Sequence, residues 1–192
     1  MKVNEIFYSI QGEGAHTGTP ALFIRFAGCN LKCPFCDTDH QSGTEMTEGD
    51  IIGQVANVPA KLVVITGGEP GLQLTESLVS KLHMMGKTVA VETNGTKELP
   101  KNVDWITISP KHPFVGAVGT PVLTKCNELK LVFDGRVQPW WYLIEADHYY
   151  LQPCDTGDKE KNQQIIEELI TFVKQNPTWK ISLQTQKLLN VR

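Results

Sequence analysis

Three cysteines, Cys29, Cys33 and Cys36, lie within eight residues of each other and directly follow a short apolar run. Thiolates at this C-x3-C-x2-C spacing can ligate three irons of a four-iron cubane and leave the fourth iron open to another ligand. A structural zinc site is normally closed by a fourth protein ligand, which His40 or Asp37 could supply here. The spacing therefore predicts a metal or cluster site, and it leaves the zinc alternative open.

Three more polar segments follow other apolar runs along the chain. They are Thr66-Gly67-Gly68-Glu69-Pro70, Ser109-Pro110-Lys111 and Gln152-Pro153-Cys154-Asp155. Each could be a plain turn, because Gly and Pro are common in turns. In a parallel sheet, however, the loops after the strands meet at one edge, where such folds place their chemistry. We therefore expect these segments and the cysteines to surround one site.

The elements that position these segments are short apolar strands separated by helical patterns. The predicted strands are Ala21 to Ala27, Lys61 to Thr66, Thr88 to Glu92, Trp105 to Ser109, Glu128 to Phe133 and Tyr149 to Leu151, with a last one at Trp179 to Leu183. Apolar residues at helical spacing predict helices at 47–58, with Thr47 as N-cap, at 73–85 and at 159–175. Strands that alternate with helices indicate an α/β fold with a parallel sheet.

Two connections are too short or too rich in Gly and Pro for a full crossover helix. They are the twelve residues between Glu92 and Trp105 and the segment from Pro110 to Pro121. A complete eight-fold barrel is therefore excluded. The predicted fold is an incomplete, open parallel (β/α) barrel of about six strands with about three helices, in one domain spanning residues 1–192.

The composition and charge of the chain argue against two kinds of partner, nucleic acid and membranes. The net charge of -3 gives no basic surface for nucleic acid, so a direct nucleic-acid partner is not expected. No window approaches 18 consecutive apolar residues and the N-terminus lacks a signal-peptide pattern, so we expect no membrane association and a cytoplasmic location.

The cysteine spacing, with Phe35 before the third cysteine, resembles the signature of the radical S-adenosylmethionine superfamily. This resemblance implies a [4Fe-4S] cluster on Cys29, Cys33 and Cys36, with S-adenosylmethionine chelated to the open iron. Reduction by one electron would then generate a 5′-deoxyadenosyl radical. In such enzymes the cofactors supply the difficult chemistry and the protein supplies binding and orientation.

The N-terminal segment is similar to one branch of that superfamily, the 7-carboxy-7-deazaguanine synthase family. The similar segments are Phe7 to Gly14 (FYSIQGEG), Thr17 to Ala21, Phe23 to Arg25, Cys36 to Thr38 and Gln184 to Lys187. The resemblance implies a lyase that converts 6-carboxy-5,6,7,8-tetrahydropterin to 7-carboxy-7-deazaguanine with loss of ammonia. Its product would enter the synthesis of queuosine-type deazapurines.

The resemblance also implies roles for particular residues. The cofactor would contact Phe35, Cys36, Asp37, Gly68, Glu69, Ser109, Pro110, Lys111, Gln152, Pro153, Cys154 and Asp155. Within this set, the Gly68 and Glu69 turn would meet the ammonium group of the cofactor. The pterin would be bound by Ile10, Gln11, Gly12, Glu13, Arg25 and Thr66.

Among these residues, Arg25 is the predicted partner of the substrate carboxylate. Thr38 would supply a hydroxyl ligand to Mg2+, although a threonine at such a position more often caps its own loop. Glu92 is the candidate for proton transfer.

The same resemblance implies an electron donor such as flavodoxin, and a homodimer. One departure is Gln186, where many relatives have a histidine, so a proton-transfer role does not carry over to this position. Two alternatives remain: a glycyl-radical activase, which shares the cysteine motif, and a zinc or cluster protein that binds a partner without catalysis.

Overall fold

A single curved sheet organises the chain. The computed structural model describes residues 1–36, 38–136 and 143–191. Within these residues the sheet has nine strands in the order β3-β1-β2-β4-β5-β6-β7-β8-β9. The strands are β1 (Lys2–Ile10), β2 (Pro20–Phe26), β3 (Thr44–Glu45), β4 (Leu62–Gly67), β5 (Thr88–Thr93), β6 (Trp105–Ile108), β7 (Lys125–Phe133), β8 (Glu145–Pro153) and β9 (Trp179–Ile181).

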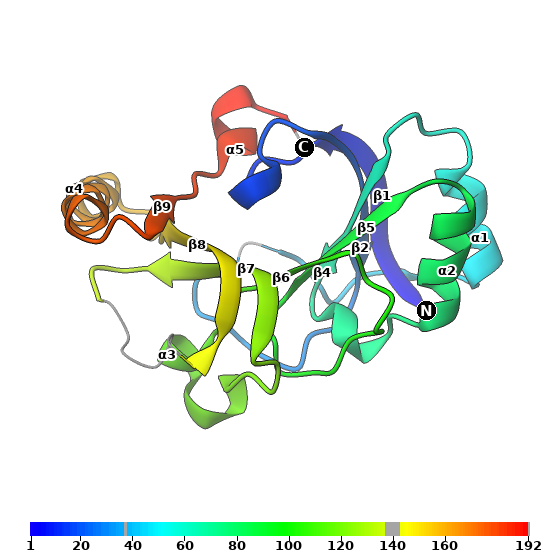
Figure 1. Ribbon diagram of the computed structural model, residues 1–192, viewed down its shortest axis with the longest axis horizontal. Coiled ribbons are helices and arrows are strands. Elements are labelled where there is room, and N and C mark those ends of the chain that lie inside the picture. The colour runs from blue at the N-terminus through cyan, green and yellow to red at the C-terminus, as the bar shows by residue number, and fades with distance from the viewer. Residues whose placement is uncertain (37, 137–142, 192) are drawn as a thin grey trace.

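The strands from β2 to β9 in this order are parallel to one another, as the alternation of strands and helices predicts. β1 and β3 are antiparallel additions at one edge. The order is linear and its two end strands do not pair, so the sheet curls without closing, as Figure 1 shows. The prediction of an open, incomplete barrel is confirmed.

Three helices cover the outer face of the sheet close to their predicted positions: α1 (Glu48–Val55), α2 (Glu76–Met84) and α4 (Lys159–Gln175). Thr47 caps α1 as predicted, through a reciprocal capping box with Asp50. α1 and α2 pack with β1, β2, β4 and β5 in one apolar cluster, and α4 packs with β6 to β9 in another. The helices thus bury the convex face and leave the concave face for polar side chains.

Several elements differ from the sequence prediction, among them the short helix α5 (Thr185–Leu189). The segment from Pro110 to Pro121 is not free of helix, because it holds α3 (His112–Val115) and the 3-10 turn η3 (Gly116–Gly119). Pro113 stands in the first turn of α3, where no intrahelical bond needs its missing N–H, so a proline does not prevent a single helical turn. The strands β1 and β3 were not predicted, because β1 is only half-buried and lacks a long apolar run, and β3 has only 2 residues.

The C-terminal segment crosses the open side of the barrel. It carries α5 (Thr185–Leu189), which lies beside the end of β1 in Figure 1. The backbone N–H and the hydroxyl of Thr185 both donate to the carbonyl of Gly12, at 3.0 and 2.9 Å. The two ends of the chain therefore close the concave face together, near the 3-10 turn η1 (Gly14–His16). None of the helices in the described ranges is long and apolar enough to span a bilayer.

Candidate active site

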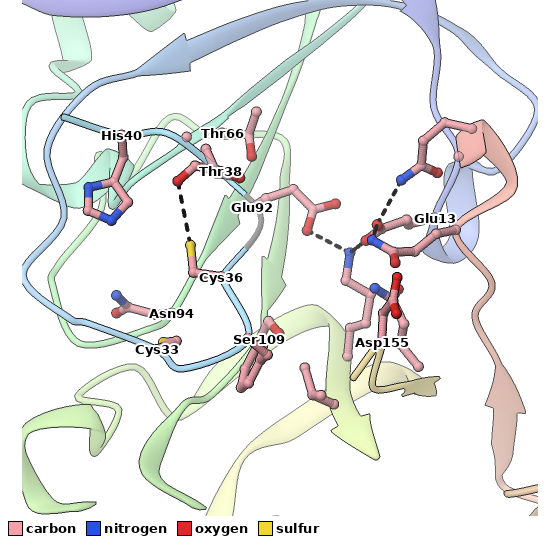
Figure 2. Close-up of a pocket in the computed structure, with 18 of the residues that line it drawn as sticks. Glu13, Cys33, Cys36, Thr38, His40, Thr66, Glu92, Asn94, Ser109 and Asp155 are labelled. Atoms are coloured by element: carbon pink, nitrogen blue, oxygen red, sulfur yellow. Dashed lines mark hydrogen bonds and ion pairs between the residues drawn. The ribbon is translucent and has the colours of Figure 1, made fainter. Parts of the chain in front are cut away.

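A cavity of about 650 Å³ occupies the concave face, from the barrel interior to the loops that follow the parallel strands. Figure 2 shows side chains from these loops and strands pointing into it. The predicted residues that line it are Ile10, Gln11, Gly12, Glu13, Arg25, Cys29, Cys33, Phe35, Cys36, Thr38, Thr66, Gly68, Glu92, Ser109, Lys111, Gln152, Pro153, Cys154 and Asp155. Of the other predicted residues, Glu69 and Pro110 do not belong to the lining, and Asp37 lies outside the described residues.

The three cysteines lie on one loop after β2. Cys29 and Cys33 are half-buried and Cys36 is exposed. Burial raises the pKa of the Cys29 and Cys33 thiols, and the backbone N–H of Leu31 donates to the Cys29 sulfur at 3.4 Å. Within the described residues, no three His, Cys, Asp or Glu side chains converge on a single ion. A cubane binds each cysteine to a different iron, so three separate thiols at one cavity wall fit such a cluster.

The loop is braced from one side by α3. The Phe35 ring packs edge-on against Phe114 of α3, with 4.6 Å between the centroids. Lys111 lies 5.9 Å from the centre of the same Phe35 ring, and its ammonium donates to the Ser109 hydroxyl at 2.6 Å. Burial lowers the pKa of Lys111. The Lys111 amino group therefore stands at the cysteine side of the cavity, held by the segment between β6 and α3.

The glycine turn after β4 braces the loop from the other side. A Cβ added to Gly68 would lie 1.8 Å from the carbonyl oxygen of Gly28, so only glycine permits this approach. The backbone N–H of Glu69 donates to the same Gly28 oxygen at 2.9 Å. The turn thus fixes the start of the cysteine loop.

Glu69 itself is fully buried behind the turn. Its carboxylate accepts hydrogen bonds from the N–H of Gly71 at 2.8 Å, the hydroxyl of Thr93 at 2.7 Å and the N–H of Asn94 at 2.8 Å. Burial raises its pKa, against the opposing effect of these hydrogen bonds. In this structure Glu69 shapes the turn, and its contact with a cofactor ammonium stays a prediction.

Asn94 also links the cysteine loop to the end of β5, which the sequence did not suggest. Its amide donates to the side chain of Asn30 at 3.2 Å, and Asn30 donates to Thr96 at 2.8 Å. Glu69, Asn94 and Asn30 therefore form a polar bridge between two predicted cofactor segments.

The inner part of the cavity is a charged network around Lys130, on β7. The Lys130 ammonium lies 2.7 Å from Glu13 Oε2 and 2.8 Å from Glu92 Oε2. The side chain of Gln11 donates to Glu92 Oε1 at 3.2 Å. Figure 2 shows Glu13 and Glu92 directed toward the same ion-pair partner.

These contacts set the charges of the network. Burial by itself would raise the pKa of Glu13, but the Lys130 charge and the hydrogen bonds from Lys130, Gln184 and Gln186 lower it to about 2. Burial would lower the pKa of Lys130, but the nearby carboxylates of Glu13, Glu92 and Glu128 raise it. Glu13 and Lys130 are therefore both charged at neutral pH.

Lys130 was missed by sequence reasoning, although one signal was present. Glu128 and Lys130 alternate with Leu129 and Leu131 in β7, which normally indicates a strand with one face in water. Both charged residues are in fact buried, because their face of the strand is the barrel interior. Two charges at alternate positions of a central strand could have pointed to a polar interior.

Two glutamines of the C-terminal segment complete this network. The side-chain amides of Gln184 and Gln186 donate to Glu13 Oε1 at 3.0 and 3.1 Å. Gly12 faces the Gln186 side chain so closely that an added Cβ would lie 1.8 Å from its oxygen. The chain termini therefore meet at Glu13, which the sequence could not show.

The remaining predicted residues lie on other walls of the cavity. Arg25 of β2 is a register partner of Thr66 in β4, and its guanidinium pairs with Glu5 at 2.9 Å over the Phe7 ring. Thr38 accepts a hydrogen bond from Cys36 through its backbone oxygen, at 3.7 Å.

The end of β8 and the residues that follow it contact the C-terminal segment of the chain. Asp155 pairs with Lys187 at 3.1 Å, and hydrogen bonds from Gly157, Asn162 and Lys187 lower its pKa to about 2. Gln152 accepts from Ser182 at 3.0 Å. Together the walls offer thiols and the Lys111 amino group at one end, and the network of Glu13, Glu92 and Lys130 at the other.

The chain is similar to known proteins both in sequence and in fold. A family model described as the radical SAM superfamily matches residues 23–115. The 7-carboxy-7-deazaguanine synthase of Bacteroides thetaiotaomicron is 47% identical over 192 residues, covering 100% of this chain and 98% of that protein. The synthase of Burkholderia multivorans is 38% identical, with 98% of each chain covered. The crystal structure of QueE from Escherichia coli superposes with a TM-score of 0.73 at 28% identity, covering 95% of this chain and 93% of that chain.

Proposed function

Because this chain belongs to the 7-carboxy-7-deazaguanine synthase family of radical S-adenosylmethionine enzymes, we propose that its cavity converts 6-carboxy-5,6,7,8-tetrahydropterin to 7-carboxy-7-deazaguanine with loss of ammonia. The matches to known synthases confirm the resemblance that the cysteine loop and the N-terminal segment indicated. One domain carries the reaction in this proposal, since one continuous sheet contributes the walls of the cavity.

The cysteine end of the cavity suits the cofactors. Cys29, Cys33 and Cys36 would hold a [4Fe-4S] cluster, and bound S-adenosylmethionine would supply the radical that removes a hydrogen atom from the substrate. Gly68 lets the turn after β4 approach the loop closely, so its backbone is placed to contact the cofactor. Ser109, Lys111 and the segment from Gln152 to Asp155 line the two flanks and would contact the rest of the cofactor.

The opposite end suits a pterin. Its pyrimidine edge presents N–H groups that donate hydrogen bonds. The acceptors for them would be the Glu13 carboxylate and backbone groups of Ile10, Gln11 and Gly12. Arg25 would pair with the substrate carboxylate and Thr66 would contact the ring from β4. Glu92 lies on the same side and would exchange a proton with the substrate as the amine leaves.

Further components belong to the same proposal. Thr38, beside Cys36, would contribute to a Mg2+ site that the substrate oxygens complete. A one-electron donor such as flavodoxin would reduce the cluster. A homodimer is consistent with the exposed apolar side chains of the C-terminal segment, among them Leu183, Leu188 and Leu189. Direct nucleic-acid binding and membrane association are not expected, and the cytoplasmic location stays a prediction.

The observation that carries the proposal is a single cavity with three cysteines at one wall and the network of Glu13, Glu92 and Lys130 at another. The test is anaerobic reconstitution with iron and sulfide, followed by dithionite, S-adenosylmethionine, Mg2+ and the carboxytetrahydropterin, with products identified by mass. We expect 7-carboxy-7-deazaguanine from the native protein and none from Cys33→Ala.

A matched control is Cys126→Ala, because Cys126 is a buried thiol outside the cavity lining. This variant should retain both the cluster and the product. Slow formation of 5′-deoxyadenosine with the pterin unchanged would contradict the proposed substrate, and would direct attention to another substrate, such as the glycine of a protein.

A further inference from the structure

Lys130 holds an unusual position among the residues of the cavity. Its side chain is 5% exposed, at the middle of a central strand, and its ammonium bridges two carboxylates from distant parts of the chain. Glu13 follows β1, and Glu92 is on β5. We call Glu13 and Glu92 the carboxylate pair. Given the distances to the shared nitrogen, the two bound oxygens can be no more than about 5.5 Å apart.

Two carboxylates this close, and largely removed from water, repel each other when both are ionised. In such pairs one group normally retains a proton. The other donors to the pair are neutral amides, from Gln11, Gln184 and Gln186. An amide hydrogen bond stabilises a carboxylate but does not cancel its charge. Lys130 is therefore what allows both members of the pair to be ionised together.

The groups around the pair do not replace this cation. Glu128 of β7 adds a further acid, and His16 of η1 is partly buried beside Trp105 of β6. Burial lowers the pKa of His16, which disfavours the charged form of its ring. Lys111 is bonded to Ser109 at the cysteine side of the cavity. In the described part of the chain, Lys130 is the one cation that contacts the carboxylate pair.

We propose that Lys130 is a positioning residue of the active site, which keeps Glu13 and Glu92 ionised and fixed so that one accepts the N–H edge of the heterocycle and the other exchanges a proton. This inference rests on the proposed function for the two roles, while the ionisation of the pair stands on the geometry. With one ammonium between two carboxylates, the inner wall retains one negative charge. Such a wall favours the donor edge of a pterin over an acceptor edge.

The test is pH-difference infrared spectroscopy of the reconstituted holoenzyme without substrate, because a protonated carboxyl absorbs separately from a carboxylate. All variants carry Glu128→Gln, which removes an acid that would titrate in the same range. In the Lys130→Met variant we expect one additional protonated carboxyl per chain as the pH falls from 8 to 6. Neither the parent nor Lys130→Arg should show this signal.

Two further variants make the result specific. Lys130→Met combined with Glu92→Gln removes one carboxylate together with the cation, so the additional signal should disappear. Lys87→Met is the matched control, because the Lys87 ammonium is bonded to the carbonyls of Val58 and Ala60, away from the cavity. It should behave like the parent.

A folded Lys130→Met variant in which both carboxyls stay ionised from pH 8 to pH 6 would overturn the inference. If this variant does not fold, the combination with Glu92→Gln decides. Folding of the double variant would support a charge role, whereas its failure, with Lys87→Met folded, would show that Lys130 acts through packing.

Measurement of KM for the carboxytetrahydropterin then tests the role of Lys130 separately from the proposed function. With the carboxytetrahydropterin, Lys130→Met should raise the KM about 100-fold at pH 7.5, and Lys130→Arg should restore most of the affinity. An unchanged KM in Lys130→Met would refute the positioning role in substrate binding. If the native enzyme does not bind the pterin, the proposed function fails, while the infrared result still decides whether Lys130 controls the ionisation of the pair.

Discussion

Glu128 should make the protein less stable as the pH rises, and Glu128→Gln should abolish this effect. Glu128 is 2% exposed, and its Oε2 accepts a hydrogen bond from Ala15 N–H at 2.8 Å. Its Oε1 is buried without a hydrogen-bond partner among the described residues. Burial, followed by the charge of Glu92, raises the pKa of Glu128 from 4.5 to about 7. The folded state therefore retains a proton that the unfolded chain gives up at lower pH.

Because the pKa is higher in the folded state than in the unfolded chain, the free energy of unfolding falls as the pH rises. Below pH 4.5 the carboxyl is protonated in both states and there is no penalty, whereas above pH 7 the folded state must hold a buried charge. At about 1.4 kcal/mol per pH unit, the full loss is about 3 kcal/mol, and about 2.5 kcal/mol of it falls between pH 5 and pH 8. A glutamine keeps an acceptor for Ala15 and cannot ionise, so its free energy of unfolding lacks this loss.

The assay is urea unfolding of the reduced apo-protein under anaerobic conditions at pH 5, 6, 7 and 8. The quantity to compare is the difference in unfolding free energy between Glu128→Gln and the native protein, since any constant penalty of the amide cancels across the pH range. This difference should move by about 2.5 kcal/mol in favour of the variant between pH 5 and pH 8. Glu98→Gln, at an exposed position, should parallel the native protein. Parallel curves for Glu128→Gln and the native protein would refute the reasoning.

Two other substitutions test separate parts of the site. Glu69→Ala removes the acceptor of three buried or partly buried donors, at Gly71, Thr93 and Asn94, so it should lower the unfolding free energy by about 3–5 kcal/mol and reduce the iron bound on reconstitution. Urea unfolding and iron analysis measure this, with Glu98→Ala as control, and a stable variant with full iron content would contradict the role of the turn. Gln186→His replaces a neutral donor to Glu13 with a group that titrates near 6.5, so kcat/KM for the pterin should become dependent on pH between 6 and 8. The ratio of the variant and native pH profiles measures this, and a constant ratio would show that residue 186 does not influence Glu13.

The agreement between prediction and structure was best where the information is local. The apolar runs of β2, β4 and β5 and the helical spacing of α4 depend on neighbouring residues in the chain, so their types could be predicted from the sequence. The strand β1 and the single turn of α3 were missed. The half-buried β1 has no long apolar run, and a single helical turn that contains a proline has no periodicity to detect.

The chemistry at the mouth of the cavity could be predicted from residue types and spacing, because the cysteines, the glycine turn and the segment from Ser109 to Lys111 each follow a strand of a parallel sheet. Such segments converge at the same edge whatever the details of packing. The inner wall, in contrast, depends on how the chain folds in three dimensions. Glu13, Glu92 and Lys130 come from positions up to 117 residues apart, and their contacts depend on which face of β7 turns inward. Alternation in a strand shows that one face is polar, but the curvature of the sheet decides whether that face meets water or encloses a buried ion pair.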